Sequence, residues 1–173
     1  MPPTGLHERV TSTPEASDAG DLVVREADRA DLLAVFRIEK AVFSQPWPFA
    51  SFERFLGAPG FLVAVRDGAV VGYAIADVSS TQGRDLGHLK DIAVHPEVQG
   101  RGIGRALLRR VLLTMAVGGA SVVKLEVREG NEVAQSLYED VGFDRVRRVP
   151  GYYDDGEDAF VMVLDIEAWN HPA

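Results

Sequence analysis

The chain has 173 residues, of which 46% are hydrophobic and 25% charged, a composition typical of one globular domain with a substantial core. Its net charge of −8 argues against direct nucleic-acid binding, and its lack of cysteine excludes disulfides, thiolate metal sites and a cysteine nucleophile. No apolar run approaches the ~20 residues of a membrane helix, so no membrane association is expected. The four histidines show no metal-ligand spacing and therefore predict no metal site.

Residues 1–20 are rich in proline, threonine, serine and alanine and carry no apolar signal segment, so we expect a disordered tail and a cytoplasmic protein. One domain is predicted over residues 21–168, followed by a short tail at 169–173. The expected strands are 22–27, 61–66, 70–78, 88–94, 122–128, 143–149 and 159–166, and the expected helices are 29–43, 50–56, 105–117 and 132–141. Asp67-Gly68 predicts a hairpin turn, and the polar stretch 79–87 predicts a loop.

The order of these elements predicts the sheet. A strand, a helix and a second strand follow one another from residue 88 to residue 128, which requires a crossover and therefore a parallel strand pair. The last two strands are expected to form an antiparallel pair around a loop that contains tyrosines. The fold class is therefore α/β with a mixed sheet.

A glycine-rich loop separates the strand that ends at Val94 from the next helix. Three glycines fall within five positions, in the run Gln99-Gly100-Arg101-Gly102-Ile103-Gly104-Arg105. Glycine lets the backbone approach a ligand, and a helix N-terminus offers free N–H groups, so this loop favours a phosphate or pyrophosphate. Its spacing matches neither the P-loop nor the dinucleotide-binding fingerprint. The alternative is an ordinary structural start of a helix.

Two later positions carry candidate acid–base groups. Within the strand expected at 122–128, apolar and charged residues alternate, so Glu126 lies on the face opposite the apolar one. A sheltered carboxylate costs free energy unless it is paired or used, so the alternatives are catalysis, an ion pair with a basic neighbour, or solvent exposure. Asn131 is the expected cap of the next helix and lies seven positions before Tyr138, on nearly the same face. Tyr138 alone is more typical of a core or boundary aromatic than of a catalytic acid.

Together these motifs resemble the ribosomal-protein alanine N-acetyltransferase (RimI-type) branch of the GNAT family. The matching motifs are Gln99-x-x-Gly102-x-Gly104, Leu125-Glu126-Val127-Arg128-x-x-Asn131, Leu137-Tyr138-x-x-x-Gly142-Phe143, Tyr152-Tyr153-x-x-Gly156-Glu157-Asp158-Ala159 and, near the N-terminus, Ile38-Glu39-x-x-x-Phe43-x-x-Pro46-Trp47. The resemblance covers about Leu22 to Ile166. It implies the GNAT fold, a mixed, mostly antiparallel sheet with a central parallel strand pair and about four helices.

The resemblance also implies an acetyl-CoA-dependent N-acetyltransferase in which an amine attacks the thioester directly, without a metal. In this branch the acceptor is a protein N-terminal α-amino group, and ribosomal proteins are its named substrates. Glu126 matches the general base, and Tyr138 matches the general acid that protonates the CoA thiolate. The implied cofactor contacts are Ile92, Ala93 and Val94 for the acetyl-pantetheine arm, Gln99, Gly100, Arg101, Gly102, Ile103, Gly104 and Arg105 for the pyrophosphate, and Asn131 for pantetheine.

His88 is a further candidate. Simple alternation places His88, Lys90 and Ile92 on one face of their strand. In some N-terminal acetyltransferases this strand position takes part in water-mediated deprotonation, so the hypothesis is that His88 assists Glu126 from the neighbouring strand. The alternative is a surface histidine.

Four aromatic residues are expected to line the entry for a peptide N-terminus: Phe43, Trp47, Tyr152 and Tyr153. Aromatic walls with nearby acidic residues suit a cationic amine on an extended chain. The alternative is a packed hairpin loop. The competing functions are acetylation of a small amine or a lysine side chain, and a non-catalytic acyl-CoA-binding module. A monomer or a weak dimer is expected.

Overall fold

A seven-stranded sheet forms the centre of the computed structural model, which describes residues 20–81 and 84–169. The strands are β1 (Val23–Glu26), β2 (Phe61–Arg66), β3 (Ala69–Thr81), β4 (Arg84–Val94), β5 (Val122–Arg128), β6 (Asp144–Val149) and β7 (Ala159–Asp165). The helices are α1 (Leu32–Val42), α2 (Phe49–Phe55), α3 (Ile103–Val117) and α4 (Glu132–Val141), with short 3-10 turns η1 (Arg29–Asp31) and η2 (Pro96–Val98). The two predicted tails, 1–20 and 169–173, lie outside the described residues except for Gly20 and Trp169.

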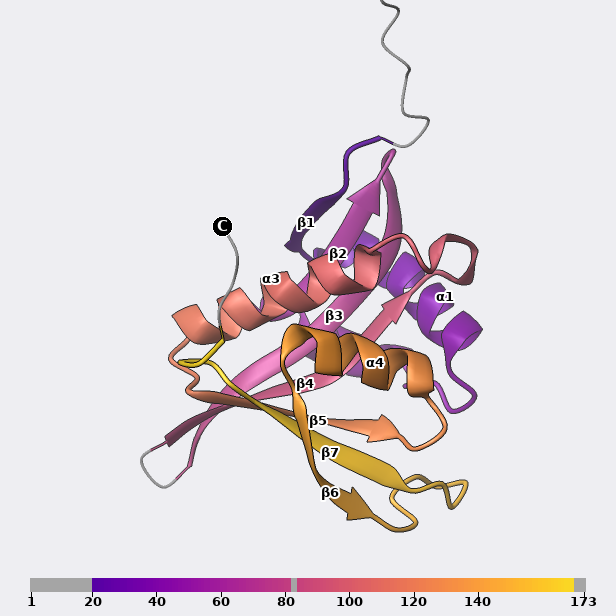
Figure 1. Cartoon of the computed structure of the whole chain (residues 1–173). Coiled ribbons are helices and arrows are strands. Elements are labelled where there is room, and N and C mark those ends of the chain that lie inside the picture. The colour runs from indigo at the N-terminus through magenta and orange to yellow at the C-terminus, as the bar shows by residue number, and fades with distance from the viewer. Residues whose placement is uncertain (1–19, 82–83, 170–173) are drawn as a thin grey trace, which may run out of the picture.

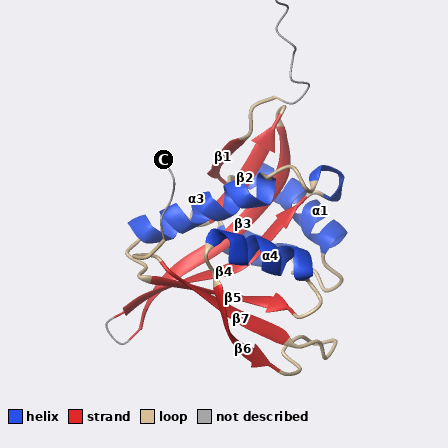
Figure 2. Ribbon diagram, in the orientation of Figure 1, coloured by secondary structure: helices blue, strands red, loops and turns tan. Residues whose placement is uncertain are grey.

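The strands are arranged in the order β1-β2-β3-β4-β5-β7-β6. All neighbours run antiparallel except β4 and β5, because α3 carries the chain back across the sheet between them. Figures 1 and 2 show α3 and α4 together on one face of the sheet and α1 on the other. Within the described residues this confirms the predicted mixed, mostly antiparallel α/β sheet with a central parallel pair and four helices.

Apolar side chains are buried on both faces of this sheet. Along β2, Leu62 and Ala64 pack toward α3, whereas Phe61 and Val63 pack toward α1 and α2. A strand covered on both faces is expected to be apolar throughout, as β2 is. Burial of each large aliphatic side chain contributes roughly 1.5–3 kcal/mol to stability. The buried face of α3 consists of Ile103, Leu107, Leu108, Val111, Leu112 and Met115.

Local sequence signals fix several boundaries. The expected cap Asp28 accepts a hydrogen bond from the Ala30 N–H at 2.8 Å, and Asp31 accepts one from the Asp28 N–H at 2.8 Å. This reciprocal capping box starts a 3-10 turn that continues into α1. The predicted hairpin turn is also confirmed, because Asp67 and Gly68 both have positive φ, at 51° and 75°.

The described residues of the stretch 79–87 belong to strands, so the prediction of a loop there is wrong. β3 continues to Thr81 and β4 begins at Arg84, so the two strands form a long hairpin arm. Ser79 pairs with Leu86 across this arm, and the Ser80 hydroxyl donates a hydrogen bond to the Asp85 carboxylate. Backbone pairing and this side-chain bond stabilise a polar strand extension, which has no apolar alternation to reveal it.

Candidate active site

β4 and β5 diverge partway along their length (Figure 1). Their parallel pairing covers residues 86–88 of β4 and 122–124 of β5, although β4 continues to Val94 and β5 to Arg128. Beyond residue 88, β4 therefore pairs with β3 on one side and with no described strand on the other. Its backbone groups on that side need hydrogen-bond partners. The gap lies at the carboxyl ends of the parallel strands, where α/β sheets bind ligands.

A β-bulge in β4 determines which side chains face which side of the sheet. The register with β3 shifts between Leu89 and Asp91, so Lys90 is an extra residue. Lys90 and His88 line the same cavity on the α1 face, whereas Ile92 packs with the α3 cluster. The expectation that His88, Lys90 and Ile92 share one face is therefore wrong for Ile92, because simple alternation does not account for the extra residue.

His88 and Glu126 meet where the two strands separate. The distance from His88 Nε2 to Glu126 Oε2 is 2.6 Å, and Lys124 Nζ lies 3.5 Å from Glu126 Oε1. The Glu126 side chain is 14% exposed. Its hydrogen bond with His88 lowers the pKa of Glu126 more than burial raises it, and the charges of His88 and Lys124 lower it further. Glu126 is therefore an ionised acceptor that contacts both an imidazole and an ammonium group.

Tyr138 lies on the opposite side of the sheet, on α4. It is 6% exposed, and its ring packs edge-on against Phe143 with centroids 5.8 Å apart. Burial raises the pKa of Tyr138, and electrostatic interactions with Asp91 and Tyr153 raise it further. The phenol therefore keeps its proton at neutral pH.

The glycine loop lies between the end of β4 and the start of α3. Gly100 and Gly102 have φ angles of 78° and 82°, a region that favours glycine, and Gly102 is the N-cap of α3. A Cβ at either position would meet no atom within 4 Å, so the surface over the loop is open. The Ala106 N–H donates to the Gly102 carbonyl, which leaves the preceding N–H groups of residues 103–105 without helical partners. Such a helix start can hold an anionic phosphate.

Side-chain contacts hold this loop and its surroundings. Gln99 Nε2 donates to the Val94 carbonyl at 3.1 Å, and Arg105 Nη2 donates to Asp140 Oδ2 of α4 at 3.2 Å. Asn131 caps α4, since its side chain accepts a hydrogen bond from the Ala134 N–H at 3.2 Å. The end of β4, the loop and the first turn of α3 together contain the expected cofactor residues Ile92, Ala93, Val94, Gln99, Gly100, Arg101, Gly102, Ile103, Gly104 and Arg105.

A cavity of about 440 Å³ opens on the α1 face, beside the His88–Glu126 pair. We call it the acceptor cavity. Its aromatic walls are Trp47, whose ring stacks on Phe55 with centroids 6.1 Å apart, and the mutually perpendicular pair Tyr152 and Tyr153, 5.0 Å apart. The full lining is Trp47, Pro48, Ser51, Arg54, Phe55, His88, Lys90, Glu126, Tyr152 and Tyr153.

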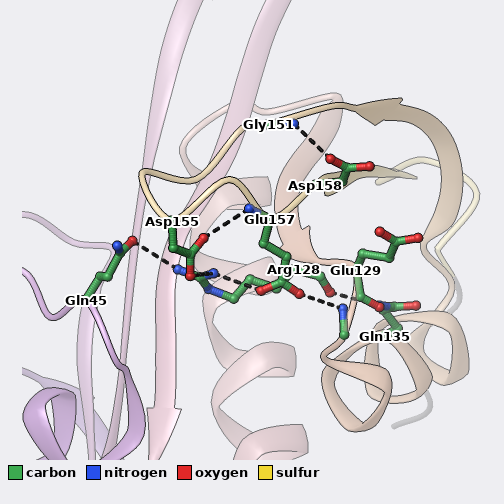
Figure 3. A network of polar contacts seen from close by, with 9 residues as sticks. Gln45, Arg128, Glu129, Gln135, Gly151, Asp155, Glu157 and Asp158 are labelled. Atoms are coloured by element: carbon green, nitrogen blue, oxygen red, sulfur yellow. Dashed lines mark hydrogen bonds and ion pairs between the residues drawn. The ribbon is translucent and has the colours of Figure 1, made fainter.

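An ionic network holds the loop that carries the two tyrosines (Figure 3). Arg128 Nη1 lies 2.9 Å from Asp155 and 2.8 Å from Glu157, and its guanidinium stacks 4.0 Å over the ring of Tyr153. Glu157 also accepts a hydrogen bond from the Gly130 N–H at 2.9 Å. Burial raises the pKa of Tyr153 to about 12, against the opposing charge of Arg128. These contacts hold the tyrosine wall in a fixed position.

The structure brings together most of the residues expected to bind the acceptor, but not all of them. Trp47 and the tyrosine pair line the acceptor cavity, whereas Phe43 packs into the cluster beneath α1 and is not among the lining residues. Sequence reasoning missed four lining residues on or beside α2 and one on β4: Pro48, Ser51, Arg54, Phe55 and Lys90. Ser51 and Phe55 are four positions apart on a helix, a spacing that predicts a shared face. Nothing local indicated that this face lines a cavity.

Known proteins share this architecture. The sequence pattern of the Acetyltransferase (GNAT) family matches residues 32–143. The chain belongs to the GNAT acetyltransferase family. It is 40% identical over 155 residues to the N-alpha-acetyltransferase RimI of Mycobacterium tuberculosis, covering 86% of this chain and 96% of that protein. It is 32% identical over 151 residues to the ribosomal protein bS18-alanine N-acetyltransferase of Escherichia coli strain K12, covering 83% of this chain and 97% of that protein.

A solved relative carries the cosubstrate. The crystal structure of Arabidopsis thaliana NAA60 in complex with acetyl-CoA matches with a TM-score of 0.74 at 22% identity, covering 84% of this chain and 99% of that chain. As a member of this family that is similar to RimI, the protein described here is an N-acetyltransferase. The open glycine surface and free N–H groups at the start of α3 suit an anionic pyrophosphate. In the described part of the chain, no group of three or more His, Cys, Asp or Glu residues could hold a metal ion. Over the same residues, no helix has the length and apolar character needed to cross a membrane.

Proposed function

We propose that this GNAT enzyme acetylates the N-terminal α-amino group of a protein in the cytoplasm. The observation that carries the proposal is the acceptor cavity, which is walled by Trp47 and the tyrosine pair and bounded by the His88–Glu126 pair. Its volume of about 440 Å³ suits the first residues of an extended peptide. The relatives named as N-alpha-acetyltransferases support this acceptor class.

The proposed base and the proposed acid lie on opposite sides of the sheet. Glu126 and His88 face the acceptor cavity on the α1 side, whereas Tyr138 belongs to the cluster on the α3 and α4 side. The start of α3, where the cosubstrate pyrophosphate would bind, is on the same side as Tyr138. This arrangement supports a base that would lie beside the amine and an acid on the side of the departing thiolate.

The Glu126–His88 pair would remove the proton from the acceptor. An α-ammonium group has a pKa near ~8 and can attack only after it has lost a proton. Because the pKa of Glu126 is lowered, the carboxylate is ionised and ready to accept that proton, directly or through a water molecule. A lowered pKa also makes it a weaker base than an ordinary glutamate. The imidazole 2.6 Å away would share the proton.

The remaining groups would bind, orient and protonate. Acetyl-CoA, when bound, supplies the thioester carbon that the amine attacks, so that a C–N bond forms and the C–S bond breaks. Backbone amides of Ile92 and Val94, which point away from β3, would orient the pantetheine arm and stabilise the oxyanion, whereas Ala93 between them pairs with Tyr73. Asn131 would contact the pantetheine. The free N–H groups after Gly102 would hold the pyrophosphate. The Tyr138 hydroxyl would give its proton to the departing sulfur.

Acetylation of a matched peptide panel tests the proposal. The panel contains peptides that differ in their first residue, including alanine, the residue that the named Escherichia coli relative acetylates on bS18. Each peptide contains one internal lysine, and its matched control carries a blocked N-terminus and the same lysine. Fragmentation mass spectrometry then locates the acetyl group. Transfer to the α-amine with none to the blocked controls is expected. Transfer to lysine alone, or to small amines alone, would refute the proposed acceptor.

A further inference from the structure

A second polar cluster lies between α1 and the bulge of β4. It consists of Glu39 from α1, Tyr73 from β3 and Asp91 from β4. Glu39 is 1% exposed and Tyr73 is 0% exposed, and the proposed reaction uses none of the three side chains. Buried ionisable groups cost free energy unless their hydrogen bonds are satisfied, so their hydrogen atoms can be counted.

The two contacts of the Tyr73 oxygen, with Glu39 and with Asp91, need two hydrogens. One phenol and two ionised carboxylates supply only one. Glu39 Oε1 accepts from the Trp47 N–H at 3.0 Å, and Glu39 Oε2 accepts from the Tyr73 hydroxyl. The oxygen of that hydroxyl also lies 3.1 Å from Asp91 Oδ2. A phenol has a single hydrogen, which Glu39 already receives. The contact between Tyr73 and Asp91 therefore needs a hydrogen on the Asp91 carboxyl, which then donates to the phenol oxygen.

The electrostatic surroundings agree with this count. Burial raises the pKa of Asp91 well above its usual range, and the hydrogen bond and charge of Glu39 raise it further. Hydrogen bonds with Tyr73 and with the Ile92 backbone lower this pKa but do not outweigh the rise. Burial likewise raises the pKa of Tyr73, together with the charges of Asp91 and Glu39. The hydrogen count and the raised pKa both place a proton on the Asp91 carboxyl.

The hydrogen-bond chain joins two walls of the acceptor cavity. At one end it reaches the backbone of Trp47, whose ring lines the cavity and lies 5.7 Å from Phe52. At the other end it reaches Asp91, which follows the bulge residue Lys90 of the β4 wall. We propose that Glu39, Tyr73 and Asp91 form a clamp that holds the Trp47 loop against the β4 bulge and so sets the width of the acceptor cavity.

Steady-state kinetics test the clamp, and this readout rests on the proposed function because it needs an acceptor peptide. Tyr73→Phe removes the hydroxyl but keeps the ring, which packs edge-on against Phe52 at 5.8 Å. We expect its KM for the peptide to rise about tenfold, while kcat and the KM for acetyl-CoA change by less than about threefold. Asp91→Ala is expected to behave in the same way. A role in stability alone would leave the peptide KM of the folded variants unchanged, and that result would overturn the clamp.

The conservative variant Asp91→Asn tests the shared hydrogen. Its side-chain amide can donate to the phenol oxygen as the protonated carboxyl does, so its peptide KM is expected to stay within about twofold of the wild-type value. Equal impairment in Asp91→Asn and Asp91→Ala would contradict the hydrogen count.

Tryptophan fluorescence provides a readout that needs no acceptor. The chain has two tryptophans, so Trp169→Phe leaves Trp47 as the reporter. In that background, Tyr73→Phe and Asp91→Ala are expected to raise the acrylamide quenching constant of Trp47 about twofold, and Asp91→Asn to leave it unchanged. Identical quenching in all four proteins would overturn the clamp even if no peptide is acetylated. Altered quenching without any peptide acetylation would instead refute the acceptor class and retain the clamp.

Discussion

Glu126→Gln is the substitution that most directly tests the acid–base assignment. Glutamine has the same shape, and its carbonyl oxygen can still accept a hydrogen bond from His88, which lies 2.6 Å from the carboxylate. The substitution removes the charge that makes the group a proton acceptor. The cosubstrate side of the sheet should be unaffected, because Glu126 faces the acceptor cavity and the glycine loop lies on the other face.

The expected loss follows from the geometry of the pair. General-base catalysis contributes about 10²–10⁴ to a rate. Because His88 remains in place and can still take up a proton, we expect kcat to fall by about 100-fold, the lower end of that range. The dissociation constant of acetyl-CoA, measured by calorimetry, should change by less than about twofold. Since the pKa of Glu126 is lowered, the ratio of variant to wild-type kcat should be constant between about pH 6 and pH 9.

Glu129→Gln serves as a control for the loss of one negative charge near the site. Glu129→Gln removes a carboxylate three residues later, one that pairs with Arg148 on the surface, and should leave kcat within about twofold. An unchanged kcat in Glu126→Gln would refute the assignment of the base. A fall in kcat accompanied by a comparable loss of acetyl-CoA affinity would show that Glu126 supports the fold of the site rather than its chemistry.

Three further outcomes are expected. Tyr138→Phe should lower kcat about tenfold or more in single-turnover assays, with acetyl-CoA affinity nearly intact, because only the proton donor is lost; a rate equal to wild type would exclude it as the acid. Gly102→Ala should weaken acetyl-CoA binding and destabilise the fold by about 1 kcal/mol, since φ is 82° there, whereas Gly104→Ala, without positive φ, should cost less. The hydrogen bond with Arg25 lowers the pKa of Asp31 in the folded protein. The ionised carboxylate therefore stabilises the fold at pH values above the pKa of the unfolded chain, and this stabilisation is lost as the pH falls through the folded-state pKa. Denaturation of Asp31→Asn should therefore show a deficit of about 1–2 kcal/mol at neutral pH that disappears in acid, and a deficit independent of pH would contradict the linkage.

Local patterns were sufficient for features that depend on neighbours in the chain. Alternation along β5 correctly separated the buried Leu125 from Glu126, and the caps Asp28 and Asn131 lie where their helices begin. The glycine loop was predictable because left-handed backbone and a free helix start require particular residues at fixed spacing. These signals were enough to predict an α/β fold, and the resemblance of several motifs in order indicated the family.

Features that depend on pairing between distant segments were not predictable in this way. The bulge at Lys90 arises from the register of β4 against β3, which no local pattern encodes. The hydrogen bonds of Glu39 connect it to residues 8 and 34 positions later, and sequence reasoning gave it no role. Alternation along β5 places Arg128 on the same face as Glu126. The carboxylates that pair with Arg128, Asp155 and Glu157, lie in the loop after β6, and nothing local in the sequence indicated that pairing. Each case needs a contact that only the folded chain provides.

The separation of β4 and β5 has a consequence for the order in which substrates bind. The acceptor cavity lies on the α1 face and the start of α3 on the other, so under the proposed function each substrate would have its own entrance and the two would meet at the gap. Under the proposed function, both must be filled before an amine can reach the thioester. An inhibitor confined to the acceptor cavity is therefore expected to act without competing with acetyl-CoA. Only a molecule that passes through the gap and occupies both faces would compete with both substrates.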